Sequence, residues 1–179
     1  MHIFLTGEIQ IGKSTIIRKV LSELKIKPGG FLTYFGQDRA RADRRLYMCG
    51  AWEQKLFDEA HSIVKFCNKG PTVVNTEKIN IYGTGLLREV RPLAPLLIMD
   101  ECGPLEKSAE DFKNEILSCL GGSVPILGVI KKLTMPAWTD QIKCHHSVRM
   151  IEVNRDNRDE LPHEILNHMR KCIHFEPGG

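Results

Sequence analysis

The feature that most constrains this chain is a glycine-rich loop near its start, which reads Gly-x-x-x-x-Gly-Lys-Ser over residues 7–14. It follows a short apolar run, residues 2–6, and it precedes residues 16–24, whose apolar side chains recur at helical spacing. A strand, a glycine loop and a helix in this order gather backbone N–H groups and a helix start around one point. The chain therefore begins with a candidate phosphate-binding loop.

The loop predicts contacts with a nucleoside triphosphate. Gly7 lets the chain leave the strand sharply, and Gly12 lets the backbone approach a phosphate closely. Lys13 would place its ammonium near the β- and γ-phosphates, and Ser14 would offer its hydroxyl to Mg²⁺. The nucleotide-binding residues expected here are Gly7, Glu8, Ile9, Gln10, Ile11, Gly12, Lys13, Ser14 and Thr15.

The middle of the loop is unusual, because Ile9, Gln10 and Ile11 stand where many such loops carry extra glycine and proline. These positions contribute mainly backbone N–H groups, which any residue other than proline supplies. We expect the two isoleucines to pack beneath or beside the loop. The composition of the loop is thus compatible with phosphate binding, although it has lost glycine flexibility.

An acidic pair, Asp100 and Glu101, follows the strongly apolar residues 96–99. In proteins with a phosphate loop, an acidic residue at the tip of an apolar strand holds Mg²⁺, which predicts that Asp100 and Ser14 are the metal residues. A second carboxylate beside it can orient and deprotonate a water aimed at the γ-phosphorus. Glu101 therefore favours hydrolysis over mere binding; the alternative is a solvated glutamate at a strand end.

The rest of the chain predicts an α/β fold with a mostly parallel central sheet and helices on both faces, because apolar strands alternate with amphipathic helices. The length of 179 residues indicates one domain, residues 1–175, with 176–179 as a disordered tail. The parallel strands expected are residues 2–6, 96–99, 124–130 and 148–153, and the helices are 16–24, 79–90, 108–120 with Ser108 as its cap, and 161–173 with Pro162 in its first turn.

Residues 29–75 are expected to form an excursion after the first helix. Residues 31–35 and 46–49 read as the two strands of a β-hairpin around a charged turn, and residues 73–74 read as a further short strand. Residues 51–70 give no clear assignment. Four arginines crowd the turn, and one of them could swing over a triphosphate, but a solvated turn is the favoured interpretation. The four are Arg39, Arg41, Arg44 and Arg45.

Five segments, taken together and in this order, resemble the small nucleoside-triphosphatases called THEP-type or cancer-related nucleoside-triphosphatases. The resemblance implies a RecA-like P-loop NTPase fold and slow, Mg²⁺-dependent hydrolysis of nucleoside triphosphates, with loose base preference. It assigns phosphate contacts to Lys13, the metal to Ser14 and Asp100, and the water to Glu101, so that Lys13 and Glu101 are the expected catalytic residues. The segments are IFLTGEIQIGKST, GGFLTYF, INIYGTGLL, LLIMDECGPLE and VNRDNRDEL.

Three further residues carry weaker predictions. Arg158, in the last of these segments, either reaches the nucleotide or is a surface arginine paired with a neighbouring acid. Glu106 matches the family pattern; the alternative is that it only caps or pairs near the following helix. Lys131 follows the strand at residues 124–130 and could approach the γ-phosphate, although a solvated lysine is the favoured interpretation.

Two other functions stay open on the same fold, namely a small-molecule or nucleoside kinase and a nucleotide-dependent switch module. A water-activating Glu101 would harm a kinase. The formal net charge of +3 makes nucleic acid an unlikely partner, and no apolar run approaches the ~20 residues of a membrane span. Six scattered cysteines without a Cys-x-x-Cys pair favour a reduced, cytoplasmic compartment. The sequence does not specify protein partners.

Overall fold

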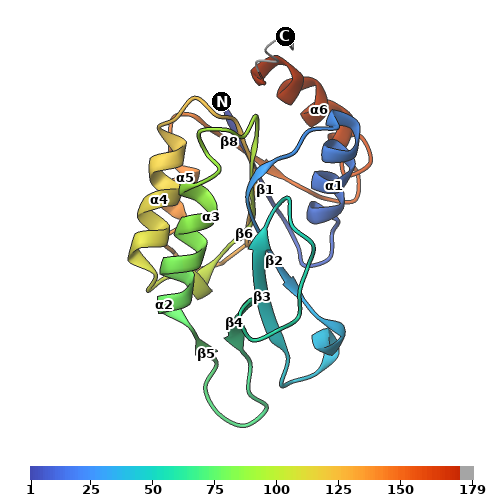
Figure 1. Ribbon diagram of the computed structural model, residues 1–179. Helices are drawn as coiled ribbons and strands as arrows, with labels where there is room; N and C mark the ends of the chain where they lie inside the picture. The colour runs from blue at the N-terminus through green and yellow to red at the C-terminus, as the bar shows by residue number, and fades with distance from the viewer. Residues whose placement is uncertain (174–179) are drawn as a thin grey trace.

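The computed structural model describes residues 1–173, so the tail expected at residues 176–179 lies outside the described residues. Within them, eight strands form one sheet in the order β5-β4-β3-β2-β6-β7-β1-β8, with helices on both faces (Figure 1). The predicted α/β fold is confirmed. The strands are β1 (His2–Thr6), β2 (Gly29–Phe35), β3 (Arg45–Gly50), β4 (Ser62–Lys65), β5 (Val73–Val74), β6 (Leu97–Cys102), β7 (Ile126–Ile130) and β8 (Val148–Glu152).

Five adjacent strands, from β2 through β6, β7 and β1 to β8, run parallel. Their carboxyl ends therefore meet at one edge of the sheet, where α/β folds bind ligands. The predicted hairpin is also present: β2 and β3 are antiparallel, with Tyr34 opposite Tyr47. β4 lies in the stretch that had no assignment, and β4 and β5 continue the antiparallel pairing. The excursion is thus an antiparallel extension of the same sheet.

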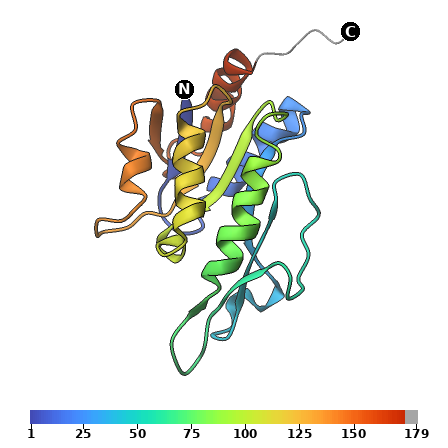
Figure 2. The same cartoon turned by 60° about the vertical axis from the view of Figure 1, so that its left-hand side comes forward.

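Helices α1 (Lys13–Leu24) and α6 (Leu161–Cys172) cover one face of the sheet, and the remaining helices cover the other (Figures 1 and 2). β1 alternates between the two cores, since Ile3 and Leu5 face α1 while Phe4 faces the opposite side. The helices of that other side are α2 (Thr76–Lys78), a π-helical turn (Ile79–Gly83), α3 (Thr84–Arg88), α4 (Glu110–Leu120) and α5 (Asp140–Lys143).

Two expected helix features turn out differently. Ser108 does not cap α4; the capping position belongs to Ala109, whose buried methyl packs in the core and whose N–H donates to the carbonyl of Glu106. Gly83, which weakens the helical sequence pattern of residues 79–90, lies within a helical turn, and packing explains why glycine stands there. A Cβ at this position would lie 2.8 Å from the ring of Phe112 in α4, so only glycine allows the two helices to approach this closely.

The helices expected at residues 16–24 and 161–173 are present, although the first begins three residues earlier, at Lys13. α1 ends at Leu24, and Pro162 lies in the first turn of α6. No helix among the residues described is both long enough and apolar enough to cross a membrane.

Candidate active site

The phosphate loop joins β1 to α1 at the edge where the parallel strands end. Gly7 has φ 139° and Gly12 has φ 115°, a region that favours glycine. A Cβ on Gly7 would also lie 2.5 Å from the carbonyl oxygen of Val153, whereas the space around Gly12 is open. Gly7 is therefore required both by its dihedral angle and by the backbone beside it, and Gly12 by its dihedral angle alone.

The three unusual residues of the loop have different environments. Ile11 packs against the core on the α1 side, as expected, but Ile9 is 75% exposed, so the packing expected for it is wrong. Gln10 adopts φ 64°, a left-handed conformation that is uncommon outside glycine. The loop therefore keeps a glycine-like path at position 10 without a glycine.

Lys13 is buried in the first turn of α1, and its ammonium turns back over the loop. Its Nζ donates to the carbonyl oxygens of Gly7 at 2.9 Å and Glu8 at 2.8 Å. Burial lowers the pKa of Lys13, and the carboxylates of Glu101 and Asp100 oppose that shift. The ammonium thus lies in the hollow of the loop and within the electrostatic reach of both acids, and its contact with phosphate stays a prediction.

The acidic pair lies within β6 rather than after it. The strand expected to end at Met99 continues to Cys102, which pairs with Ile130 of β7, but the pairing is irregular between Met99 and Cys102. This break in the ladder contains Asp100 and Glu101, which are joined by a cis peptide bond. On the other side, the backbone N–H of Glu101 donates to the hydroxyl of Thr33 in β2 at 3.2 Å.

Both acids have raised pKa values because the protein buries them. Burial raises the pKa of Asp100 to about 6, and interaction with the Ser14 hydroxyl works against this shift. Burial also raises the pKa of Glu101, while the positive charges of Lys131 and Lys13 lower it. Two carboxyl groups at this edge thus have pKa values raised above the ordinary range, a property of sites that bind cations or transfer protons.

Glu106 is a third buried carboxyl group in the same region. Its Oε2 accepts a hydrogen bond from the backbone N–H of Gly103 at 2.8 Å, so it caps the short helical turn Pro104–Glu106 rather than the helix that follows. Burial raises its pKa to about 7, opposed by this hydrogen bond and by the charge of Lys131. Lys131 lies beside Gly103, is half-buried and lines the same cleft, and its approach to a phosphate stays a prediction.

A cleft of about 680 Å³ connects these groups. It is bounded by the phosphate loop, the ends of β2 and β6, and the hairpin. Predicted residues that line it are Gly7, Glu8, Ile9, Gln10, Lys13, Asp100 and Glu101. Ile11, Gly12, Ser14, Thr15 and Arg158 are not part of this lining.

The predicted residues outside the lining differ in how close they lie to the cleft. Ser14 begins α1 together with Lys13, and its hydroxyl interacts with Asp100. Thr15 accepts a hydrogen bond from Arg18 on the exposed side of α1. Arg158 is exposed in the turn between β8 and α6, so its contact with a nucleotide remains a prediction.

Several basic residues line the cleft that the sequence does not indicate or for which it favours a solvated position. Arg39 and Arg44 of the hairpin line the cleft, whereas Arg41 pairs with Asp43 and Arg45 pairs with Glu59. Lys55 also lines the cleft, and it lies in the stretch without an assignment. The density of arginine at the turn was the available signal for two of these; no local pattern indicates Lys55.

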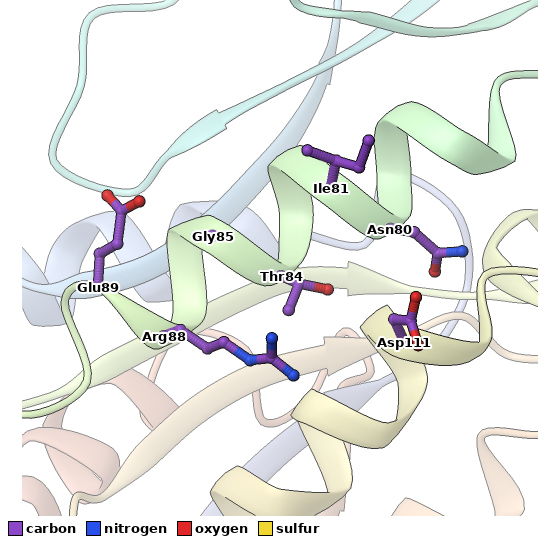
Figure 3. A pocket seen from close by; sticks show the side chains of 7 residues that line it. All are labelled: Asn80, Ile81, Thr84, Gly85, Arg88, Glu89 and Asp111. Atoms are coloured by element: carbon purple, nitrogen blue, oxygen red, sulfur yellow. The ribbon is translucent and has the colours of Figure 1, made fainter.

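A second hollow, of about 580 Å³, lies between α3 and the start of α4, on the face of the sheet opposite α1 (Figures 1 and 3). Two of its polar side chains join the π-helical turn and α3 to α4. The side chain of Asn80 accepts a hydrogen bond from the backbone N–H of Phe112, and Arg88 forms an ion pair with Glu115 at 2.7 Å. These contacts hold α3 against α4.

The oxygen atoms of Ser14 and Asp100 suit Mg²⁺. A magnesium ion is bound by one or two protein oxygens together with substrate phosphates and waters. A buried Asp100, with a pKa raised by desolvation, gains from any cation placed beside it. Among the described residues, no three His, Cys, Asp or Glu side chains gather as a protein-only metal site. The donors present therefore fit a metal ion that arrives with a triphosphate.

Comparison with known proteins places the chain in a family. The family model NTPase_1, described as NTPase, matches residues 2–166. This chain belongs to that family. The match spans the phosphate loop, the acidic pair and the hairpin, so the resemblance expected from the five segments is confirmed.

Individual relatives match over nearly their whole length. The chain is 28% identical over 168 residues to the nucleoside-triphosphatase THEP1 of Thermotoga sp. strain RQ2, covering 93% of this chain and 94% of that protein. It is 24% identical over 185 residues to the cancer-related nucleoside-triphosphatase homolog of Bos taurus, covering 94% and 96%. The crystal structure of THEP1 from Aquifex aeolicus is similar in fold, with a TM-score of 0.76 at 21% identity, covering 94% and 99%.

Proposed function

We propose that this protein hydrolyses nucleoside triphosphates to the diphosphate and phosphate in the presence of Mg²⁺, with loose base preference. The observation that carries the proposal is a single cleft in which the buried ammonium of Lys13 faces the paired carboxyl groups of Asp100 and Glu101. Family membership and the names of the relatives support hydrolysis as the reaction. The cytoplasmic location and the absence of membrane and nucleic-acid partners remain predictions.

The phosphate chain would lie along residues 7–15, against the loop N–H groups and the start of α1. The carbonyls of Gly7 and Glu8 that now accept from Lys13 would give way to phosphate oxygens, which are stronger acceptors for an ammonium. Ser14 and Asp100 would hold the metal. When bound, Mg²⁺ neutralises charge on the phosphate oxygens. Asp100 must be ionised to bind a cation well, and its pKa of about 6 permits this at neutral pH.

Glu101 would act on the attacking water. Its carboxylate accepts one proton as the water oxygen forms a bond to the γ-phosphorus, and the bond from that phosphorus to the β–γ bridging oxygen breaks. The electron pair leaves with the nucleoside diphosphate, and the proton on Glu101 passes to solvent or product. A raised pKa makes this carboxylate a stronger base than an exposed glutamate.

A kinase is the second candidate, and the shape of the cleft is the observation in its favour. The cleft extends past the acids to Arg39, Arg44 and Phe66, which leaves space beside the phosphate loop for an acceptor molecule. A nucleotide-dependent switch is the third candidate, since a phosphate loop serves to bind a nucleotide whether or not hydrolysis follows.

Phosphate release separates these functions. ATP, GTP, CTP and UTP are each supplied with Mg²⁺ and without an acceptor. We expect steady release from all four, and none when EDTA replaces Mg²⁺. Release that requires an added nucleoside or metabolite would identify a kinase, and tight binding with almost no release would identify a switch.

A further inference from the structure

The loop between β3 and β4, residues 51–61, is anchored to the sheet by one tyrosine. The Tyr34 hydroxyl donates to the carbonyl of Leu56 at 2.6 Å and accepts from the N–H of Leu56 at 3.0 Å. The ring of Phe57 packs edge-on against Tyr34 and Tyr47, with centroids 5.6 Å and 5.5 Å apart. A loop that satisfies both backbone groups of one residue in this way is held in a defined position.

This anchored loop carries Lys55 to the cleft. The ammonium of Lys55 lies 5.1 Å from the centre of the Tyr34 ring, a cation–π distance, and the residue lines the cleft. Its positive charge reaches Asp100, where it acts in the same direction as that of Lys13. No carboxylate of residues 1–173 forms an ion pair with it. Lys55 is therefore a cation on the same cleft as Asp100, with its charge available to an anion.

Two of the neighbouring cations, Lys132 and Arg44, are more fully occupied by contacts within the protein. Lys132 forms ion pairs with Glu8 at 3.1 Å and with Glu152 at 2.8 Å. The Arg44 guanidinium lies over the ring of Phe66 at 4.5 Å and donates to the carbonyl of Arg41. These contacts hold both side chains at the rim of the cleft.

We propose that Lys55 contacts the terminal phosphate of the bound nucleotide and stabilises the negative charge that develops during its transfer to water. This inference rests on the proposed function, whose phosphate chain starts at Lys13 and ends near Asp100. Lys13 would then approach the phosphates from the loop, and Lys55 would approach the last phosphate from the hairpin side. Fixed cations aimed at developing charge are a main source of rate in phosphoryl transfer.

The test compares Lys55→Ala, Lys55→Arg and the control Lys27→Ala. Lys27 is an exposed lysine before β2, at the opposite end of that strand from the cleft. Because Lys55 is also exposed, all three variants should fold, and equal melting temperatures would verify this. Under saturating Mg-ATP, we expect Lys55→Ala to lower kcat by about 10²-fold, the usual effect of losing one such group. Lys55→Arg should recover most of that loss, and Lys27→Ala should match the wild type.

Binding gives a second measurement that does not depend on turnover. In EDTA, the dissociation constants of ATP and ADP are measured for the same variants. A contact with the terminal phosphate predicts that Lys55→Ala raises the dissociation constant of ATP and leaves that of ADP unchanged. The preference for ATP over ADP should therefore fall. Equal losses for ATP and ADP, or no loss for either, would overturn the proposal even if the wild type hydrolyses ATP normally. A wild type without hydrolysis would instead overturn the proposed function, and the binding comparison would still decide the role of Lys55.

Discussion

The hydroxyl of Thr33 accepts a hydrogen bond from the backbone N–H of Glu101 at 3.2 Å. The parallel pairing of β2 with β6 extends only as far as Leu32 and Asp100. At Glu101, the next residue of β6, the backbone N–H donates to the side chain of Thr33 instead of to a backbone carbonyl. A hydroxyl of the neighbouring strand therefore helps to position the backbone of the proposed water-activating residue.

Replacing that hydroxyl should misplace Glu101 without removing it. We expect Thr33→Val to lower kcat by about tenfold and the free energy of unfolding by about 1 kcal/mol, since a partly buried N–H loses its partner. Thr33→Ser keeps an acceptor and should retain most of the activity. Steady-state kinetics and urea denaturation measure both effects. Equal rates for Thr33→Val and wild type would show that this bond does not position Glu101.

The two glycines of the phosphate loop should respond unequally to alanine. Both have positive φ, which costs a residue with a Cβ roughly 1–2 kcal/mol. Only at Gly7 would the new Cβ also meet a backbone oxygen, that of Val153, at 2.5 Å. Thermal unfolding should therefore show a clearly larger loss of stability for Gly7→Ala than for Gly12→Ala. The reverse order would contradict this account of the loop.

The buried carboxyl of Glu106 should make stability depend on pH. Its pKa rises from 4.5 to about 7 on folding, so the folded protein binds more protons than the unfolded chain between these values. The free energy of unfolding should thus fall as pH rises from about 4.5 to 7. Glu106→Gln keeps an acceptor for Gly103 and removes this dependence. As pH rises from about 4.5 to 7, the free energy of unfolding of the variant should therefore increase relative to that of the wild type by up to about 3 kcal/mol.

Urea denaturation of both proteins at several pH values measures that difference. The raised pKa values of Asp100 and Glu101 act in the same direction, but they are present in both proteins and largely cancel. Stability curves that stay parallel from pH 4.5 to 8 would mean that Glu106 is not desolvated in solution.

Lys13 should contribute to binding of the phosphates and not to binding of the nucleoside. Lys13→Ala is expected to weaken ATP binding at least tenfold, since a charge-assisted bond to phosphate is lost, and to leave adenosine binding unchanged. Calorimetric titration with both ligands compares the two losses. Equal weakening of ATP and adenosine would remove Lys13 from the phosphate site.

The parts of the site that sequence reasoning found are those encoded by local pattern. The loop, β1 and α1 are consecutive, so residue spacing alone placed Lys13 and Ser14 at the start of a helix. The acids could be placed because the apolar residues 96–99 directly precede them. Ser108 was assigned as a cap from residue type, and the tertiary contacts that bury Ala109 overrode that preference.

The parts that sequence reasoning missed depend on contacts between distant segments. The position of Lys55 is set by Tyr34, which is 22 residues from the backbone it holds at Leu56. Nothing in residues 51–61 has a strand or helix period, so this loop gives no local signal. The same holds for Thr33, whose role appears only when β2 is placed beside β6.

The most direct test of the central claim is phosphate release by Glu101→Gln, measured together with its ATP affinity. Glutamine keeps the size of the side chain and its backbone bond to Thr33, but it cannot accept a proton from water. We predict unchanged ATP binding and phosphate release lowered by about 10²-fold or more. Release at the wild-type rate would contradict the assignment of Glu101 as the residue that activates water.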